Sequence, residues 1–260
     1  MSFAGKNVAI TGAAGGIGQA LCRHFGRAGA SIAAIDRSPS VRDFASELMK
    51  DGVAAEAEVV DIGDAGAVAE AFERLAKRGA IDILVNNAGF SNHATFAKTD
   101  PAGWSEAVNG NLNGAYHCAY AVLPGMRAKR GGVIVNVGSV NGLAALGGPA
   151  YSAAKAGMIS MTRSLALEYG RYGVRVNIVL PGTVRTPLWN KRTKKNPKVL
   201  ATLERWYPLG RIVEPTDVAR AVAFLASDDA SAITGVALPV DCGLTAGNII
   251  MARELTLEDF

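Results

Sequence analysis

Tyr151 and Lys155 are the residues whose types and spacing point most directly to chemistry. On a helix, residues four positions apart lie on one face, so the phenol and the ammonium group can reach the same ligand. A phenol with its ordinary pKa of about 10 is a poor base near neutral pH, but a nearby ammonium group favours the phenolate. The pair indicates acid–base chemistry at an alcohol or carbonyl oxygen. For this spacing alone, a solvated helical pair remains the alternative.

A second group of residues has the features of a dinucleotide site. Residues 11–18 read Thr-Gly-Ala-Ala-Gly-Gly-Ile-Gly, between a short apolar run and a helical segment. Glycines let the backbone approach a pyrophosphate, whose charge is met by free N–H groups at a helix N-terminus. The next apolar run ends at Asp36, about 20 residues further on, where a carboxylate can accept hydrogen bonds from a ribose. A plain glycine-rich turn and a capping aspartate are the alternatives for each feature taken singly.

Asp36 also bears on the choice of cofactor. Its negative charge would repel a 2′-phosphate on the same ribose, which favours NAD over NADP. Arg37 follows it directly and could bind that phosphate, so NADP stays open.

The elements that must position these groups alternate along the chain. Apolar runs rich in β-branched residues precede longer helical segments, and they cover residues 8–10, 32–35, 57–60, 81–85, 133–137 and 174–180. This alternation, with almost no polar residue in the runs, predicts an α/β fold: a doubly wound parallel sheet with helices on both faces. In such sheets ligands bind outside the carboxyl ends of the strands. We expect one domain over residues 1–260, since no hinge-like segment divides it.

Composition excludes several classes of protein. The chain has 260 residues, of which 49% are hydrophobic and 19% charged, which does not fit a disordered tail. No signal-like segment and no apolar stretch of about 18 residues is present, so we expect a cytoplasmic protein that contacts no membrane. The three cysteines lie far apart, which predicts neither disulfides nor a metal site.

Taken in order, the motifs resemble those of the classical short-chain dehydrogenase/reductase family, from about residue 6 to 247. The glycine spacing G-x-x-x-G-x-G differs from that of most dinucleotide folds. The other motifs are Asn-Asn-Ala-Gly at 86–89, Asn111, Ser139, Tyr151 with Lys155, and Pro181-Gly182. The resemblance implies a Rossmann-type fold, an NAD(P) cofactor and, as is usual in the family, a homotetramer. The apolar helix expected over residues 150–169 would then face a second subunit.

The resemblance also implies roles for four catalytic residues. Tyr151 would be the general acid/base, and Lys155 would lower its pKa and bind the nicotinamide ribose. Ser139 would hydrogen-bond the substrate oxygen, and Asn111 would anchor a water chain from Lys155 to solvent. Hydride would pass directly between the substrate carbon and the cofactor.

The cofactor residues implied by the resemblance follow the strand ends. The glycine loop would hold the pyrophosphate, Asp36 the adenosine ribose, and residues 61–62 the adenine; residues 87–89 would flank the ribose, and 181–186 would hold the nicotinamide carboxamide. The full set is Gly12, Gly16, Ile17, Gly18, Asp36, Asp61, Ile62, Asn87, Gly89, Tyr151, Lys155, Pro181, Gly182, Val184 and Thr186.

Two departures from the family pattern concern the substrate side. The interval from Ser139 to Tyr151 is one residue shorter than in many members. Cys242 stands where relatives usually carry glycine, and we expect a small packed residue rather than a reactive thiol. His93, on the loop side where substrate should enter, is a weak candidate for substrate contact.

The basic character of the chain is concentrated in residues 185–211, the segment where this family varies its substrate lid. It holds one acidic residue, Glu204, and eight basic ones: Arg185, Lys191, Arg192, Lys194, Lys195, Lys198, Arg205 and Arg211. The whole chain has a net charge of +4, and the remainder has more acidic than basic residues. A lid for an anionic or sugar-like substrate is one interpretation and a solvated surface the other. Residues 244–260 extend past the family's usual end and could cover a neighbour's site.

The sequence therefore predicts an NAD-dependent oxidation of a secondary alcohol, of polyol, sugar or hydroxy-acid type, to its carbonyl. An NADPH-dependent reductase of ketones or of 3-oxoacyl carrier-protein substrates is the nearest alternative. A catalytically silent dinucleotide-binding regulator is an alternative of another class. We expect no nucleic-acid partner.

Overall fold

One parallel sheet organises the chain in the computed structural model, which describes residues 1–91 and 95–259, without the side chains of 191 and 192. Seven strands lie in the order β3-β2-β1-β4-β5-β6-β7. They are β1 (Asn7–Thr11), β2 (Ser31–Asp36), β3 (Ala55–Val59), β4 (Ile83–Asn86), β5 (Gly132–Val137), β6 (Val174–Pro181) and β7 (Ala237–Val240). The direction of winding reverses between β1 and β4, and the crevice for a ligand is expected at such a switch point.

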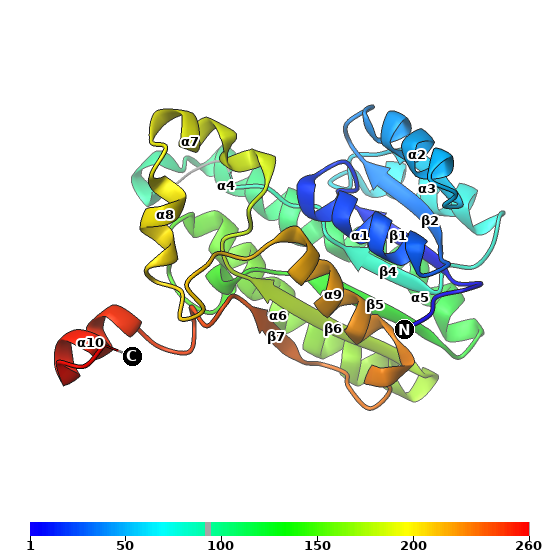
Figure 1. The fold of residues 1–260 in the computed structure, drawn as a ribbon. Helices are drawn as coiled ribbons and strands as arrows, with labels where there is room; N and C mark the ends of the chain where they lie inside the picture. The colour runs from blue at the N-terminus through cyan, green and yellow to red at the C-terminus, as the bar shows by residue number, and fades with distance from the viewer. Residues whose placement is uncertain (92–94, 260) are drawn as a thin grey trace.

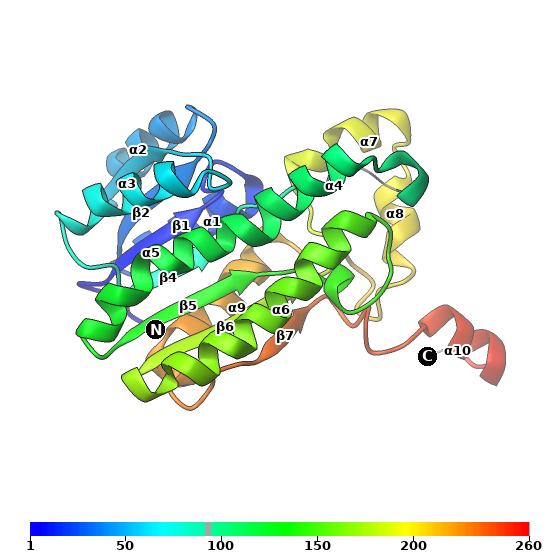
Figure 2. The same ribbon diagram turned by 180° about the vertical axis from the view of Figure 1, so that it is seen from behind.

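Helices cover both faces of the sheet, as the sequence predicts (Figures 1 and 2). One face carries α1 (Gly16–Arg27), α2 (Val41–Lys50) and α9 (Pro215–Ala226). The other carries α3 (Ala65–Ala76), α5 (Gly114–Ala128) and α6 (Pro149–Tyr169), with α4 (Pro101–Val108) beside α6. A five-residue π-helix, η2 (Asn109–Asn113), joins α4 to α5. Short 3-10 helices are η1 (Phe96–Lys98), η3 (Val140–Gly142), η4 (Gly170–Tyr172), η5 (Pro187–Trp189) and η6 (Asp228–Ala230).

The central strands explain why the sequence shows apolar runs instead of alternation. In β1, Val8 and Ile10 enter the core under α1 and α9, whereas Ala9 enters the core on the opposite face. Successive side chains of a strand point to opposite faces, so a strand covered on both sides is apolar throughout.

Three strands differ from the sequence prediction, and two of them lie at the sheet edges. β3 begins and ends earlier than predicted and contains Glu56 and Glu58, so the expectation of almost no polar residues is wrong there. Arg78 and Arg74 pair with these glutamates, and β3 bonds only to β2. β7 was not predicted, because a four-residue edge strand with Pro239 has too short a pattern to recognise. β4 also begins two residues later than expected.

Three short helices lie beyond the carboxyl edge of the sheet. α7 (Asn190–Lys195) and α8 (Val199–Glu204) stand over that edge, and α10 (Ile249–Thr256) projects away from the body at the C-terminal end (Figure 1). No helix among the described residues is long and apolar enough to cross a membrane.

Candidate active site

Tyr151 and Lys155 lie in the first two turns of α6, as the spacing predicts. Two glycines with left-handed backbone, Gly147 (φ 90°) and Gly148 (φ 63°), end the preceding loop, and Pro149 occupies the first helical turn. The Lys155 Nζ atom lies 5.6 Å from the centre of the Tyr151 ring. The loop geometry thus starts the helix where both side chains face the carboxyl end of β5.

Lys155 is the most deeply buried charged group of the site, with 2% of its surface exposed. Its Nζ donates to the Val137 carbonyl oxygen at 2.9 Å and lies 3.4 Å from Met158 Sδ. Burial lowers the pKa of Lys155 to about 8 because the charged form loses its hydration. The sulfur of Met158 had not been predicted as a contact, and its i+3 position on the same helix was the signal available.

Ser139 ends the β5 segment, one residue after Gly138, and caps η3. Burial raises the pKa of the Tyr151 phenol, and a hydrogen bond with Ser139 acts in the opposite direction. The two hydroxyl groups expected to meet the substrate oxygen are therefore neighbours. The lowering of the Tyr151 pKa by Lys155 stays a prediction.

Asn141 is a residue of the site that no motif in the sequence predicts. Its backbone N–H donates to Ser139 Oγ at 3.2 Å, and its Oδ1 lies 3.4 Å from the same hydroxyl. Its Nδ2 donates to the Gly147 carbonyl at 2.8 Å and to Ser152 Oγ at 3.3 Å. Asn141 thus ties Ser139 to the loop before α6. A polar residue in the loop that follows the end of β5 was the signal that could have found it.

Asn111 lies in the π-helix η2 and is fully buried. Its Nδ2 donates to the carbonyls of Phe90 and Ala107, both at 2.9 Å, and its Oδ1 accepts from the Phe90 N–H at 3.2 Å. A methyl group built on Gly89 would lie 2.6 Å from Asn111 Oδ1 and 3.2 Å from Lys155 Nζ. Asn111, Gly89 and Lys155 therefore meet at one point. π-helical turns are frequent at functional sites.

The glycine loop packs so closely on its neighbours that a side chain at Gly12 or Gly18 would collide with the backbone. Gly12 adopts φ 66°, and a methyl group there would lie 2.8 Å from Ala88 Cα; at Gly18 it would lie 2.0 Å from the Gly12 oxygen. No side chain caps the N-terminus of α1, and no acidic residue lies in its first turn. The N–H groups of Gly16, Ile17 and Gly18 are thus placed for an anion, and this cradle fits a pyrophosphate.

Asp36 is held at the end of β2, beside the loop. Its Oδ2 accepts from the Ala14 N–H at 3.0 Å and its Oδ1 from the Ser38 N–H at 2.9 Å. Asn87 supports the loop from the other side, because its Nδ2 donates to the carbonyls of Thr11 (2.9 Å) and Gly12 (3.1 Å). The side-chain amide of Asn87 therefore holds the loop.

The remaining predicted cofactor residues lie at neighbouring strand ends. Asp61 accepts from the Gly63 N–H at 2.9 Å. The side chain of Ile62 is buried in the core against Gly114, so a contact with adenine would have to come mainly from its main chain. Thr186 lies against Gly16, since a methyl group on that glycine would come 3.0 Å from Thr186 Cβ.

The segment 181–186 is fixed by its neighbours. Pro181 pairs with Val240 of β7, and the Gly182 N–H donates to the Val240 carbonyl at 3.1 Å. Val184 forms a bridge with Val213. The unpredicted strand β7 therefore positions the proposed nicotinamide segment.

Several lid residues pack on the body. Arg185 pairs with Glu204 (3.1 Å) and Glu214 (2.8 Å), and Arg211 pairs with Asp217 (2.6 Å). Tyr207 is buried and accepts a hydrogen bond from the Thr183 N–H at 2.9 Å. The ends of the segment are therefore anchored, and among its described side chains Lys194, Lys195 and Lys198 form no ion pair.

The structure shows the backbone at the two departures from the family pattern, Cys242 and the short interval from Ser139 to Tyr151. Cys242 is partly buried and adopts φ 52°, the left-handed region that favours glycine, which fits its position where relatives usually have that residue. The shortened interval contains the two left-handed glycines before α6. His93 lies outside the described residues.

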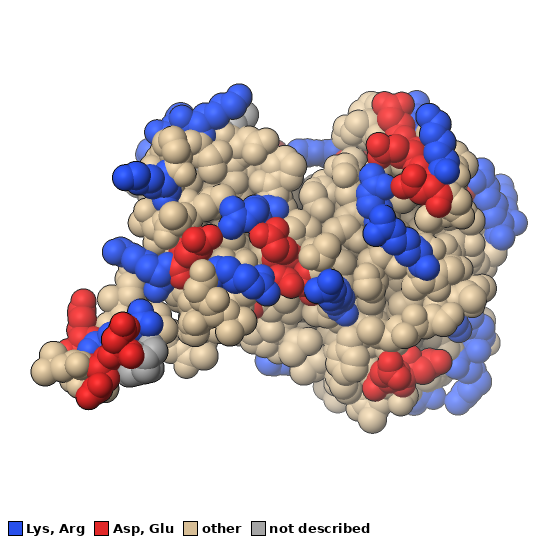
Figure 3. All heavy atoms as spheres, viewed as in Figure 1, with Lys and Arg blue, Asp and Glu red and all other residues tan. Residues whose placement is uncertain are grey.

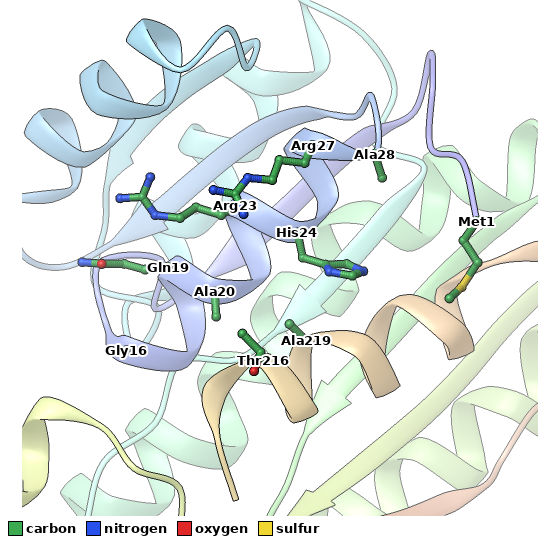
Figure 4. A pocket seen from close by; sticks show the side chains of 10 residues that line it. All are labelled: Met1, Gly16, Gln19, Ala20, Arg23, His24, Arg27, Ala28, Thr216 and Ala219. Atoms are coloured by element: carbon green, nitrogen blue, oxygen red, sulfur yellow. The ribbon is translucent and has the colours of Figure 1, made fainter.

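A cleft of about 610 Å³ between α1 and α9 lies apart from this chemistry (Figure 4). His24 and Thr216 line it, and of the predicted cofactor residues it contains only Gly16. None of the four predicted catalytic residues lines it. Among the described residues no group of three or more His, Cys, Asp or Glu is placed to hold a metal ion, and the absence of a metal requirement stays a prediction.

The fold and the uncapped glycine loop are those of a dinucleotide-binding protein. The sequence model described as Enoyl-(Acyl carrier protein) reductase matches residues 12–245. A solved oxidoreductase of the short-chain dehydrogenase/reductase family from Burkholderia thailandensis is 51% identical, with a TM-score of 0.92 and 98% of each chain covered. An uncharacterised oxidoreductase of Schizosaccharomyces pombe is 44% identical over 100% of this chain and 98% of its own length. The chain belongs to the classical short-chain dehydrogenase/reductase family.

Solved relatives hold both nucleotides. A gluconate 5-dehydrogenase from Burkholderia cenocepacia, 32% identical, is in complex with NADP and tartrate (TM-score 0.89; 95% of this chain and 97% of that chain). A 3-oxoacyl-[acyl-carrier protein] reductase from Brucella melitensis, also 32% identical, contains NAD (TM-score 0.86; 94% and 92%). Family membership therefore establishes the class of cofactor and leaves the choice of nucleotide to the site.

Proposed function

We propose that this protein is an NAD-dependent dehydrogenase that oxidises a secondary alcohol of polyol, sugar or hydroxy-acid type to its carbonyl. The observation that carries the proposal is the convergence of Ser139, Tyr151 and Lys155 at the carboxyl end of β5. The N-terminus of α1, directly after the glycine loop, has no side-chain cap. The whole chain would act as one dinucleotide-binding and catalytic domain, with residues 185–211 as the substrate lid.

In this mechanism the chain's residues orient the alcohol and handle its proton. When bound, the nicotinamide supplies the hydride acceptor. Ser139 and Tyr151 hydrogen-bond the hydroxyl oxygen, and the Tyr151 phenolate takes the hydroxyl proton as the carbon–hydrogen bond breaks and the C=O bond forms. Lys155 favours the phenolate by its charge, and Asn111 and Gly89 border the route by which that proton would reach solvent.

Asp36 supports NAD as the cofactor. Its carboxylate is fixed by two backbone N–H groups, so a 2′-phosphate on the adenosine ribose would meet a negative charge that cannot readily move away. The Arg37 guanidinium lies 5.2 Å from the centre of the Phe90 ring, engaged in a cation–π contact. The alternative, an NADPH-dependent ketone or 3-oxoacyl carrier-protein reductase, predicts a preference for NADPH with the same substrate.

The decisive experiment is a screen of NAD+ and NADP+ reduction with sugars, polyols, hydroxy acids and uncharged alcohols, using wild-type protein and Tyr151→Phe. We expect turnover with NAD+ that Tyr151→Phe abolishes while nucleotide binding persists. Near-normal turnover by that variant would remove the catalytic assignment, and a strong NADP+ preference would remove the role given to Asp36. Nucleotide binding without turnover across broad panels in both directions would favour the silent regulator.

The oligomeric state and cell compartment belong to the same proposal. α6 leaves small residues exposed on its outer face, including Ala153, Ala156 and Ser160, which suits close helix packing in a homotetramer. The free cysteines Cys22 and Cys118 are buried, as befits a protein of the reducing cytoplasm. Light scattering of the purified protein tests the tetramer.

A further inference from the structure

The C-terminal arm, residues 244–259, extends away from the body of the protein, and the side chains of its helix are not packed against that body. α10 has no buried residue. Met251 and Leu255, four positions apart on one face, are 55% and 72% exposed. Both views show α10 standing clear of the sheet and its helices (Figures 1 and 2). An isolated eight-residue helix is marginal in water, so its apolar face needs a surface to pack on.

The mouth of the candidate active site offers exposed apolar side chains. Leu143 and Leu146 lie in the loop between Ser139 and Tyr151, and Leu188 follows Thr186. Leu188 is 83% exposed, and the other two leucines are about half exposed. These leucines follow the carboxyl ends of β5 and β6, where substrate and cofactor are expected. Their apolar side chains face solvent beside a site whose proposed chemistry is favoured by the exclusion of water.

Charges on the arm and the lid are opposite. The arm carries Glu254, Glu258 and Asp259 against one basic residue, Arg253, which pairs with Asp259 at 3.1 Å. The exposed lysines of the lid, Lys194, Lys195 and Lys198, form no ion pair within the described part of the chain. Figure 3 shows Lys and Arg gathered over α7 and α8, and Asp and Glu on α10, in separate parts of one face. The arm of a protomer thus points away from its own lid.

We propose that the C-terminal arm of one copy seats on the active-site mouth of a second copy, with Met251 and Leu255 against the exposed leucines and its carboxylates beside the lid lysines. Because one chain carries both surfaces, a two-fold pair would satisfy each of them twice. The active site is complete only in that pair. The docking itself does not depend on the reaction, whereas its effect on turnover rests on the proposed function.

The first test locates the arm without using activity. A photo-crosslinking benzophenone amino acid replaces Leu255 in the full-length protein, and the irradiated product is separated by denaturing electrophoresis and mapped by mass spectrometry. We expect a product of twice the chain mass, joined to residues 143–148 or 186–205. A crosslink within one chain, a crosslink to another surface, or no crosslinked product would overturn the proposal.

The second test asks whether the arm completes the partner's site. Met251→Ser with Leu255→Ser removes the apolar face, and we expect kcat/KM to fall by about tenfold or more. The matched control is Met49→Ser on α2, an equally exposed methionine (53%) far from the site, which should leave kcat/KM unchanged.

Mixed pairs then show whether the arm affects the active site of the partner chain or that of its own chain. The arm variant and Tyr151→Phe are coexpressed with different affinity tags, and species carrying both tags are purified. In a mixed pair the intact arm covers the intact Tyr151, so about half of the wild-type activity per pair should return. Activity no higher than the mean of the two separate variants, or wild-type activity of the arm variant alone, would overturn the proposal. If wild-type protein turns over no substrate, the proposed function fails while the crosslink still decides the docking.

Discussion

Lys155 shows how a single residue of this site combines function with a cost in stability. Its ammonium group is buried with one carbonyl and one thioether as neighbours. Neither carries a negative charge, so desolvation dominates and lowers the pKa of Lys155 to about 8. The same burial fixes the charge near Tyr151, where the proposed reaction needs it.

We expect Lys155→Met to raise the free energy of unfolding near pH 7 while turnover is lost. Below pH 8 the native protein carries a buried charge that the unfolded chain hydrates, at a cost of about 3 kcal/mol. The unfolded chain keeps its proton up to the ordinary pKa of 10.5, so wild-type stability should rise with pH between about 8 and 10.5.

Urea unfolding of wild type and Lys155→Met as a function of pH measures this difference. The gap between the two proteins should be widest below pH 8 and narrow as the pH approaches 10.5. Lys194→Met, on the exposed lid, serves as the control and should show no such pH-dependent gap. If Lys155→Met is less stable than wild type at pH 7, burial of the Lys155 charge does not destabilise the native protein.

Asp36→Asn should change cofactor choice more than it changes the fold. Asparagine keeps one acceptor oxygen for the backbone N–H groups of Ala14 or Ser38 and removes the charge. We expect the ratio of kcat/KM for NADP+ to that for NAD+ to increase about tenfold or more. Asp61→Asn removes the same charge at the adenine end, and the ratio should stay near its wild-type value.

At the scale of elements, the start of α1 depends on glycines that no other residue can replace. A methyl group on Gly18 would meet the Gly12 oxygen at 2.0 Å, so Gly18→Ala must displace the loop that forms the anion cradle. We expect a Kd for NAD+ at least about tenfold weaker, measured by fluorescence titration. Gly125→Ala on α5 is the matched change, because a methyl group there has no neighbour within 4 Å.

Gly125→Ala should leave the Kd for NAD+ unchanged and raise the free energy of unfolding by about 0.5–1 kcal/mol, since alanine favours a helix interior. Equal effects of the two substitutions on nucleotide binding would show that the loop geometry is not the cause.

Elements with long patterns could be predicted from sequence, and short or irregular ones could not. The helix carrying Tyr151 and Lys155 begins within one residue of its predicted start, because a long apolar pattern defines it. The π-helix around Asn111 has no pattern of its own, since it depends on the joining of two helices. The unpredicted strand β7 consists of four residues and acquires its strand geometry by pairing with β6.

At the scale of the whole molecule, the net charge of +4 is the sum of a basic segment, residues 185–211, and a remainder with more acidic than basic residues. The ends of the basic segment are neutralised by Glu204, Glu214 and Asp217. Lys194 and Lys195 of α7 and Lys198, directly before α8, remain exposed. This distribution favours attraction of an anion at the mouth rather than a general affinity for nucleic acid.

If the lid lysines contact a substrate anion, salt should weaken its binding. We expect the KM for a hydroxy-acid substrate to rise about threefold between roughly 0.02 and 0.2 M NaCl, because screening shortens the range of the attraction. The KM for an uncharged alcohol should rise less over the same range. Steady-state kinetics with both substrates measure this, and parallel changes would assign the lid charge to a solvated surface.

The sequence by itself determined the first six strands in order, the glycine loop, Asp36 and the Tyr151–Lys155 pair, because each depends on local spacing within one segment. Tertiary structure decided what these groups face. It brought the Asn141 N–H into a hydrogen bond with Ser139 and packed Thr186 against Gly16. It directed Arg185 and Arg211 into ion pairs with the body and left the face of α10 uncovered. Such contacts join residues far apart in the chain or depend on the exact turn between them, so neither composition nor periodicity can specify them.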